Sequence, residues 1–533
     1  MLSRALGILG LLGLWGLWGF SSPALSAPPF GDSLVDASIA EATNLIPALA
    51  NDTSSMAVVG QVYRGLVKYD ENLKLVGDLA ESWDISEDQR TVTFHLKKGI
   101  VWEDGTPFTA QDSLFTWKLM SDPLVPTSYG ADFQEIEEAS APDDYTFSVT
   151  YRRTMANAVA IWGFSQMPKR LLEGANLDES PLARQPVGNG PFRLENWEVG
   201  QRMTLAASET FEGGRPPLNR LITLNIPDQA TQFMELKSGA LDMMTLTPDQ
   251  WLEAQDDRLL NEAYNFFRHP AFAYSYLGFN LQDPRLSDAR VRRAINYAID
   301  KEEIVAGVLL GLGRAANGPF KPDMWSNNQN LPPFPFDPDQ ARRLFQEAGW
   351  ADADGDGILE KDGQKFVLNI MTNQGNKTRE QVCLIIQARL KEVGVDARVR
   401  IVEWAALTKE YLDNHDFEAV LLGWTIPLDP DLYDVFNSTK TKKGELNFVG
   451  YGNPEVDALI DEARFNLDQG VRKAALDRIQ EIFYEDAPYV FLYVPDNLVA
   501  ISKRFVGPKV APIGVVHEVE KWYVPLDRQV YVE

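Results

Sequence analysis

The pattern that most constrains the fold is a strand, a helix and a second strand in the later half of the chain. An apolar run over 366–371 precedes a stretch over 378–393 in which apolar residues recur at the spacing of one helix face. Gly394 ends that stretch, and a second apolar run follows over 397–402. This order predicts a βαβ unit. Strand-like and helix-like segments alternate along the rest of the chain, which favours an α/β fold.

The region from 63 to 186 has a different pattern. Short stretches such as 91–96 and 146–151 carry apolar side chains at every second position. Such alternation is typical of strands with one buried face. We therefore predict a smaller, β-rich subdomain inserted into the first body of the fold.

The first 27 residues have the order of a secretory signal peptide. Arg4 precedes an uncharged run over 5–20, and small residues suited to signal peptidase follow it. A membrane anchor is the alternative, but the run is shorter than the roughly 20 residues that a spanning helix needs. We expect cleavage near Ser26 or Ala27. Because no cysteine follows the run, we expect no lipid attachment and a location in the periplasm.

Charge and cysteine content limit the partners and the chemistry. The formal net charge of -26 repels phosphate backbones, so we expect no nucleic-acid partner, and the simplest interpretation of the charge is solubility. The single cysteine, Cys383, excludes an intramolecular disulfide. It lies in the predicted helix over 378–393, where a buried structural thiol is favoured over a nucleophile.

Sequence motifs for catalysis are missing. None of the four histidines has the H-E-x-x-H spacing, and neither a nucleophile elbow nor a phosphate-binding loop occurs. Acidic pairs such as Asp429 and Asp431 are common in so acidic a chain. We predict a protein that is not an enzyme, with no catalytic residues, no metal and no cofactor.

Residues 352–357, with the sequence DADGDG, suggest a calcium loop. The carboxylates stand at positions 1, 3 and 5 and a glycine at position 6, as in an EF-hand. Position 12 is Gly363, where a bidentate glutamate is required. We favour a turn between a helix and a strand, with calcium binding as the alternative.

Residues 79–113 carry a resemblance to a known family. The segment reads LAESWDISEDQRTVTFHLKKGIVWEDGTPFTAQDS and resembles the signature of the family 5 bacterial extracellular solute-binding proteins. Further blocks follow in the family's order: GNGPF at 188–192, KSGALD at 237–242, LGFN at 277–280 and FVGYGNPE at 448–455. The resemblance covers essentially all of the mature chain.

The resemblance implies a type II periplasmic-binding-protein fold of the cluster C kind. In that fold two hinged lobes enclose the ligand, and an extra smaller domain lies beside the first lobe. After a signal peptide at 1–27, we expect the first lobe to be formed by 28–62, 187–277 and 495–533, the extra subdomain by 63–186, and the second lobe by 278–494.

The resemblance also implies the function of the extracytoplasmic receptor of an ABC importer. Such a protein is expected to be a monomer that captures peptides, oligopeptides in particular, and passes them to a membrane permease with its ATPase. A receptor for a metal chelate, a sugar or an opine is the alternative. An exported hydrolase or folding factor on the same scaffold is the third hypothesis.

The segment GWTIPLDPDLY at 423–433 is the main candidate for ligand contact. It follows an apolar strand predicted over 417–422, and α/β proteins bind ligands beyond the ends of their strands. The Trp424 face can pack an extended ligand, and the Asp429 carboxylate can meet an ammonium group. The alternative is that Trp424 fills a core and Asp429 only makes a turn. The candidates from this segment are Gly423, Trp424, Thr425, Asp429 and Tyr433.

This segment departs from the family pattern at one position. In dipeptide receptors and many oligopeptide receptors of the family, an aspartate three residues after the tryptophan holds the amino group of the peptide, whereas this chain has Pro427 there. The segment is more similar to the branch with a "GW…DPD-Y" pattern, which is associated with longer peptides. Either Asp429 replaces the missing anchor or the ligand has no free amino terminus.

Three more residues are expected at the site from the resemblance. Trp404 belongs to the family's EW element, and Tyr63 begins a YRGL stretch in which Arg64 replaces the usual glutamate. Asn280 ends the first crossover strand and could offer its amide to a ligand. Arg64 could place a cation near the cleft or be a solvated surface residue.

Overall fold

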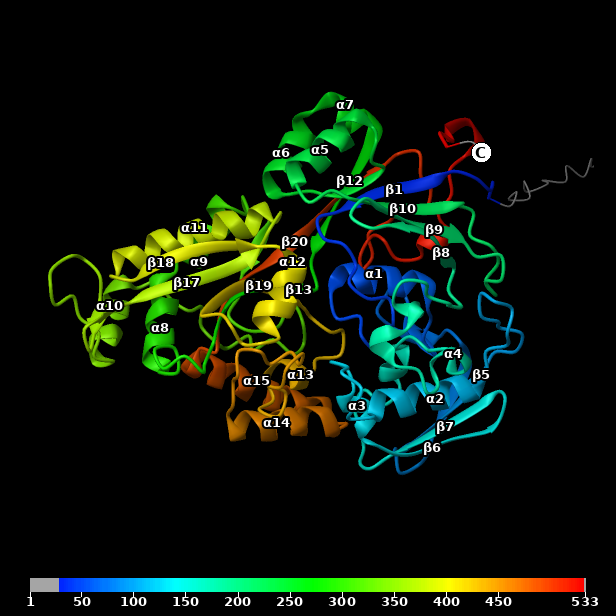
Figure 1. The fold of residues 1–533 in the computed structure, drawn as a ribbon, viewed down its shortest axis with the longest axis horizontal. Helices are drawn as coiled ribbons and strands as arrows, with labels where there is room; N and C mark the ends of the chain where they lie inside the picture. Colours follow the sequence, from blue (N-terminus) through cyan, green and yellow to red (C-terminus); the bar gives the residue numbers. More distant parts are fainter. Residues whose placement is uncertain (1–27, 532–533) are drawn as a thin grey trace, which may run out of the picture.

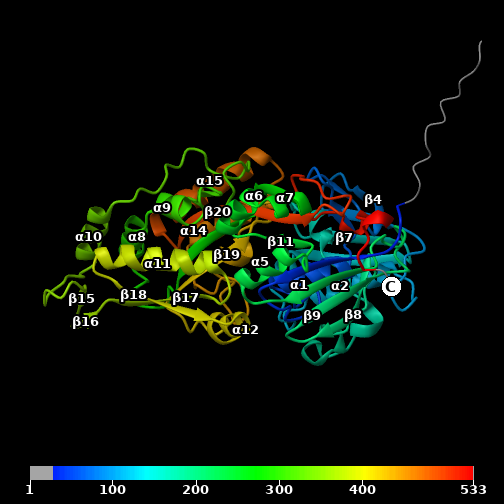
Figure 2. The same ribbon diagram turned by 90° about the horizontal axis from the view of Figure 1, so that it is seen from above.

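The computed structural model describes residues 28–531. The chain forms two lobes that lie side by side, with helices packed on mixed sheets (Figures 1 and 2). This architecture confirms the α/β prediction. The signal peptide expected at 1–27 lies outside the described residues. Within 28–531, no helix has the length and apolar character needed to cross a membrane.

The second lobe is built on a sheet that separates two cores. Leu421 packs in one core and Val420 in the other, because successive side chains of a strand point to opposite faces. Its strands are β13 (Ala273–Phe279), β19 (Ala419–Thr425), β17 (Val367–Asn373), β18 (Asp396–Val402) and the first half of β20 (Tyr489–Ser502).

Helices cover both faces of this sheet, and short strands complete the lobe (Figure 1). The helices are α8 (Ala289–Ala298), α9 (Lys301–Gly307), α10 (Pro338–Glu347), α11 (Lys377–Glu392), α12 (Trp404–Ala406), α13 (Tyr433–Phe436), α14 (Pro454–Phe465) and α15 (Gln469–Asp486). The short strands are β14 (Gly313–Ala315), β15 (Glu360–Lys361) and β16 (Gln364–Lys365).

The predicted βαβ unit is present as β17, α11 and β18. The two strands pair in parallel along their whole length, from Val367 opposite Asp396 to Asn373 opposite Val402. Helix α11 buries Cys383 completely, and burial raises the pKa of its thiol to about 12. The cysteine is therefore the buried structural thiol that its position in the helix predicts.

The first lobe is assembled from segments that are distant in sequence. Strands β1 (Ser33–Ser38), β10 (Arg220–Asn225), β9 (Arg202–Ala207) and β8 (Phe192–Glu198) form one sheet in that order. A second group of strands consists of β11 (Met243–Thr245), β12 (Tyr264–Pro270) and the last half of β20. In this group β11 and β12 both pair with β20. The helices of the lobe are α1 (Thr53–Val62), α5 (Gln229–Ser238), α6 (Pro248–Asp256) and α7 (Arg258–Ala263).

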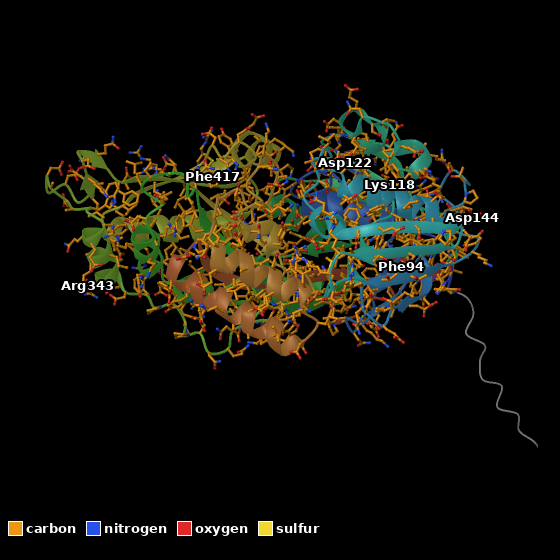
Figure 3. All side chains as sticks on the ribbon, turned by 90° about the horizontal axis from the view of Figure 1, so that it is seen from below. Phe94, Lys118, Asp122, Asp144, Arg343 and Phe417 are labelled. Carbon is orange, nitrogen blue, oxygen red and sulfur yellow. The ribbon has the colours of Figure 1, made fainter. Side chains whose placement is uncertain are left out.

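A β-rich subdomain extends from the first lobe, and its side chains are seen from below in Figure 3. The two stretches predicted at 91–96 and 146–151 are its central strands, with Phe94 paired opposite Phe147. Both rings are fully buried, together with Trp162. The elements are β2 (Val67–Tyr69), β3 (Leu75–Gly77), β4 (Ala80–Ile85), β5 (Thr91–Leu96), β6 (Ile136–Asp143), β7 (Thr146–Tyr151), α2 (Ala110–Ser121), α3 (Ala131–Gln134) and α4 (Lys169–Leu172).

Two connections join the lobes. Strand β12 pairs with the last half of β20, ending at Pro270 opposite Asp496, and β13 pairs with the first half. Strand β13 also pairs with β19 from Ala273 onward. The boundary expected after residue 277 therefore falls inside a strand that belongs to the second lobe along its whole length.

The acidic segment at 352–357 is a turn between α10 and β15. Its carboxylates are exposed, and Asp352 accepts hydrogen bonds from two backbone N–H groups of the turn. The Lys365 ammonium forms ion pairs with Asp354 and Asp356. The lysine and the backbone thus already satisfy the carboxylates that a calcium ion would need.

Candidate functional site

A small cavity of about 80 Å³ lies where the two lobes meet. The second lobe supplies the end of β19 and the start of α12, together with the loop around Phe448. The first lobe supplies the loop that leads into α1. Its lining includes Thr43, Asn51, Asp52, Trp404, Gly423 and Trp424.

Trp424 forms part of an aromatic stack in this wall. Its ring lies nearly parallel to that of Tyr276, with 6.1 Å between centroids and 7° between planes. Tyr276 stacks in turn on Tyr489 at 4.1 Å, and the Trp424 Nε1–H donates to the Tyr489 hydroxyl over 3.3 Å. Because Tyr276 and Tyr489 are buried, they hold the half-buried indole in one orientation at the cavity wall.

Gly423 permits a close approach beside that indole. A Cβ atom at this position would lie 3.0 Å from the carbonyl oxygen of Tyr274 and 3.0 Å from a guanidinium nitrogen of Arg379. The Arg379 guanidinium donates to the Asn373 side chain over 2.7 Å. Within residues 28–531, Arg379 has no carboxylate at ion-pairing distance. Among the described residues, Arg379 is thus a guanidinium without a paired carboxylate that lies next to Gly423, outside the cavity lining.

A second cavity, of about 360 Å³, lies between the subdomain and the second lobe. Asp429 lines it with Leu428 and Leu467, opposite subdomain residues that include Tyr69 and Met155. Burial raises the pKa of the Asp429 carboxyl, although the neighbouring Arg472 opposes the shift.

Asp429 already has an ionic partner. Its carboxylate accepts from the Arg472 guanidinium over 2.6 Å. A ligand ammonium group would therefore share this carboxylate with Arg472, because Asp429 is already ion-paired in this structure.

The wall contributed by the first lobe is organised around Asp52. Its carboxylate caps α1 by accepting from the Ser55 backbone N–H over 2.9 Å, and it also accepts from the hydroxyls of Ser55 and Thr43. The sequence carries an N-cap pattern here, since an aspartate stands three residues before a serine at a helix start. We did not predict Thr43, Asn51 and Asp52 as site residues, because that pattern indicates a helix start and not a cavity.

The lobes are in direct contact through a buried ion-pair cluster. Arg464 on α14 forms ion pairs with Asp132 of the subdomain and, over 3.1 Å, with Asp431 of its own lobe. Only 4% of the Arg464 side chain is exposed. The cluster therefore joins α14 to α3, which lie next to each other in Figure 1.

Neighbouring contacts strengthen this junction. The Thr154 hydroxyl donates to the carbonyl of Phe465 over 2.8 Å, and the Ser128 hydroxyl donates to that of Gly444 over 3.2 Å. Arg153 forms an exposed ion pair with Asp461 over 3.3 Å. The structure therefore shows the two lobes closed against each other.

Asp434 lies beside the cluster with an altered acidity. Burial raises the pKa of its carboxyl to about 7, and the negative charges of Asp431 and Asp132 add to the shift. The cations of Lys440 and Arg464 oppose it. In the closed form, Asp434 therefore takes up a proton at a much higher pH than an ordinary aspartate does.

The residues predicted from 423–433 fall in different places. Gly423 and Trp424 line the smaller cavity with Trp404, and Asp429 lines the larger one. Thr425 is exposed at the end of β19. Tyr433 lies under the Arg464 guanidinium, 4.1 Å from its ring centroid, and so supports the interlobe cluster.

Two other residues that were predicted to contact the ligand make contacts within their own lobes. Tyr63 is buried in the core of the first lobe with 3% exposure, and burial raises the pKa of its hydroxyl. The Asn280 amide donates to the carbonyls of His415 and Phe417 and accepts from the Gln282 backbone. These bonds place the Asn280 amide in loop packing of the second lobe, and its contact with a ligand stays a prediction.

Arg64 fits neither of its two interpretations. It is buried and forms an ion pair with Asp78 over 2.6 Å and a longer one with Glu212. The structure corrects both the solvated arginine and the cleft cation to a paired, buried guanidinium.

Comparisons with known proteins agree with this geometry. Residues 74–446 match the family model described as bacterial extracellular solute-binding proteins, family 5 middle. The oligopeptide-binding protein AppA of Bacillus subtilis (strain 168) is 32% identical over 506 residues, which cover 93% of this chain and 92% of AppA.

Solved structures extend the likeness to the whole fold. AppA from Bacillus subtilis in complex with a nonapeptide has a TM-score of 0.89 at 31% identity, covering 94% of this chain and all of AppA. NikZ from Campylobacter jejuni in complex with Ni(L-His) has a TM-score of 0.84 at 28% identity, covering 93% of this chain and all of NikZ.

Proposed function

This chain belongs to the family 5 bacterial extracellular solute-binding proteins, and we propose that it captures peptides between its lobes and delivers them to the permease of an ABC importer. The solved relatives confirm the type II periplasmic-binding-protein fold. The observation that carries the proposal is that the second lobe forms two cavities with the first lobe and its subdomain, one of them at the oriented indole of Trp424. The likeness to a nonapeptide complex supports peptides as the ligand class.

The proposed mechanism has no chemical step. A ligand that contacts both walls binds the closed form more tightly than the open form, and this difference shifts the population toward closure. The proposed hinge lies at Ala271 and Phe272, between β12 and β13, and at the neighbouring position of β20 near Pro495. The hinge gives lobe boundaries at about 271 and 495, with the subdomain kept at 63–186.

Ligand recognition follows from the groups at the two cavities. Trp404 and Trp424 offer aromatic surface for the side chains of the ligand. In this proposal Asp429 receives the amino terminus of the peptide and shares its charge with Arg472. The larger cavity at Asp429, of about 360 Å³, adds a second place between the subdomain and the second lobe that a bound peptide could occupy.

The wider setting comes from the family. The proposed protein is a periplasmic monomer that is not an enzyme, and its partners are a membrane permease and the ATPase that drives it. A receptor for a non-peptide solute is the second candidate, because the nickel–histidine complex of NikZ has the same fold.

Native mass spectrometry of the mature protein, purified without denaturation, tests the proposal. We expect adducts with peptide masses that fragment to amino-acid residues, since ligands enclosed between lobes survive gentle purification. A synthetic copy of the main peptide would then be titrated into wild-type protein and into Trp424→Ala. Loss of the indole surface should weaken binding at least about tenfold.

The matched control is Trp83→Ala, because Trp83 lies on β4 of the subdomain and lines neither interlobe cavity. Its peptide affinity should equal that of the wild type. A single adduct with a non-peptide mass would show that the ligand is not a peptide, while the protein would still be a solute receptor. Equal affinity of Trp424→Ala and wild type would remove the cavity from the proposal.

Peptide affinity should depend on pH through Asp434. Its raised pKa of about 7 in the closed form means that closure binds a proton, so affinity should fall a few-fold between pH 6 and pH 8. Asp434→Asn carries no charge at either pH and should flatten this part of the profile. Isothermal titration calorimetry at pH 6 and pH 8 measures the peptide affinity. If the affinity of Asp434→Asn changes with pH as much as that of the wild type, another group causes the effect.

A further inference from the structure

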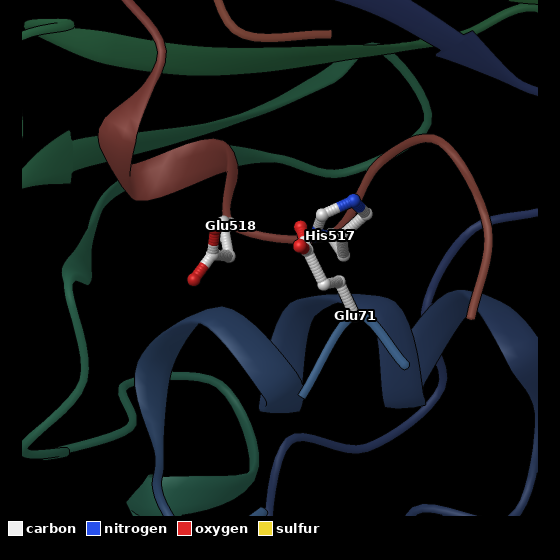
Figure 4. Close-up of side chains that lie close together, drawn as sticks. All are labelled: Glu71, His517 and Glu518. Atoms are coloured by element: carbon white, nitrogen blue, oxygen red, sulfur yellow. The ribbon is translucent and has the colours of Figure 1, made fainter. Parts of the chain in front are cut away.

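A histidine and two glutamates meet at the junction of the subdomain and the first lobe, shown in Figure 4. Glu71 lies in the turn between β2 and β3, and His517 and Glu518 lie in the C-terminal segment. One potential ligand atom from each residue lies within 4.8 Å of the other two. None of the three lines either interlobe cavity, so they form a place separate from the peptide cleft.

His517 is the unexplained member of this group. Both of its ring nitrogens are buried, and neither has a hydrogen-bond partner. A neutral imidazole carries one N–H donor and one acceptor, and buried polar atoms in proteins are nearly always satisfied. An unsatisfied ring nitrogen beside two carboxylates is the arrangement expected of a metal ligand without its metal.

The two carboxylates are partly neutralised by lysines. One oxygen of Glu71 pairs with Lys509, and one oxygen of Glu518 pairs with Lys521. Each carboxylate has a second oxygen for which the described residues supply no hydrogen bond. Each carboxylate therefore keeps an oxygen that can bind a cation in addition to its lysine.

We propose that Glu71, His517 and Glu518 bind a first-row divalent transition metal ion, with Zn²⁺ as the representative case. Imidazole nitrogen with carboxylate oxygen suits Zn²⁺, Mn²⁺ or Ni²⁺, whereas Ca²⁺ and Mg²⁺ take oxygen ligands. Ligand atoms around Zn²⁺ are about 3.3–3.5 Å apart at bonds of about 2.0–2.2 Å. Small side-chain rotations would bring the three ligand atoms, which lie within 4.8 Å of one another, to this spacing.

The position of the site indicates what the metal does. Glu71 belongs to the hairpin that opens the subdomain, and the other two ligands belong to the last segment of the first lobe. By binding ligands from both, the ion would link the subdomain to the last segment of the first lobe and stabilise their junction. The exposed carboxylates at 352–357 lack a histidine and pair with Lys365, so they make no comparable site.

Zinc titration of the metal-free mature protein tests the proposal. Calorimetry should find one tight Zn²⁺ site per chain, and Zn²⁺ should raise the melting temperature. His517→Ala should weaken the binding at least about tenfold and remove the thermal shift. His95→Ala is the matched control, because His95 is an exposed histidine bonded to Asp84. It should bind Zn²⁺ as the wild type does.

Two outcomes would overturn the site: no Zn²⁺ binding by the wild-type chain, or equal affinity in His517→Ala. If His517→Ala does not fold, Glu71→Gln keeps the imidazole and removes one ligand charge. Co²⁺ then serves as a spectroscopic probe. The visible bands of the wild-type complex should change in Glu71→Gln, and an unchanged spectrum counts against the proposal.

Discussion

Replacing Arg464 with methionine should weaken peptide binding by more than about a hundredfold while both lobes stay folded. In the closed form the Arg464 side chain is 4% exposed and forms ion pairs with Asp132 and Asp431. Removing one partner of a buried ion pair leaves an uncompensated charge, which costs about 3–5 kcal/mol. Opening the lobes returns Asp132 to water, so the cost falls on the closed form and lowers affinity.

Arg153→Met is the matched control on the same junction. Arg153 also forms an ion pair across the lobes, with Asp461, but its side chain is 44% exposed. Exposed pairs contribute about 0–1 kcal/mol, so affinity should change less than about fivefold. Calorimetry with the co-purified peptide measures both variants, and small-angle scattering reports whether the ligand still closes the lobes.

A double-mutant cycle with Asp132→Asn tests whether Arg464 acts on peptide affinity through its ion pair with Asp132. If Arg464 acts through Asp132, the two changes together should cost clearly less than the sum of the two single changes. Equal binding by Arg464→Met and Arg153→Met would show that burial of this pair does not drive closure. Additive effects would place the contribution of Arg464 at Asp431 or Tyr433.

Local patterns in the sequence predicted what local physics determines. The βαβ unit followed from helix spacing between two apolar runs. The strand predicted over 417–422 is present as β19, although it begins at Ala419 and extends through Trp424 to Thr425. Trp424 lies at the cavity because side chains at the end of a strand face the space between lobes. These features depend on residues that are neighbours in the chain.

Contacts between distant segments could not be predicted in this way. Asp132 and Arg464 are separated by 332 positions, and no local pattern marks them as partners. Arg472 stands 43 positions after Asp429 and neutralises the carboxylate that looked free in the sequence. Asn280 was expected to contact a ligand because it ends a strand. Its amide instead donates to the backbone carbonyls of His415 and Phe417, in the distant loop that leads into β19.

Replacing Arg504 with methionine should destabilise the first lobe by about 3–5 kcal/mol. The guanidinium donates to both oxygens of Asp242, to Asp32 and, over 2.7 Å, to the Ser33 carbonyl. Asp32 also accepts from the backbone N–H of Val530. One arginine thus joins the early, middle and last segments of a lobe that the chain enters three times. Urea unfolding followed by tryptophan fluorescence measures the loss.

The pH dependence of the Arg504→Met variant identifies the cause of that loss. Burial raises the pKa of Asp242, and Arg504 opposes the shift, so removing Arg504 raises this pKa further. A carboxyl whose pKa is higher in the folded state binds a proton on folding, and its destabilising effect shrinks as pH falls. The deficit of Arg504→Met should therefore be smaller at pH 5 than at pH 8. Arg258→Met, at an arginine that is 82% exposed, should change stability by less than about 0.5 kcal/mol at either pH. A deficit that is equal at both pH values would assign the loss to packing and not to unpaired carboxylates.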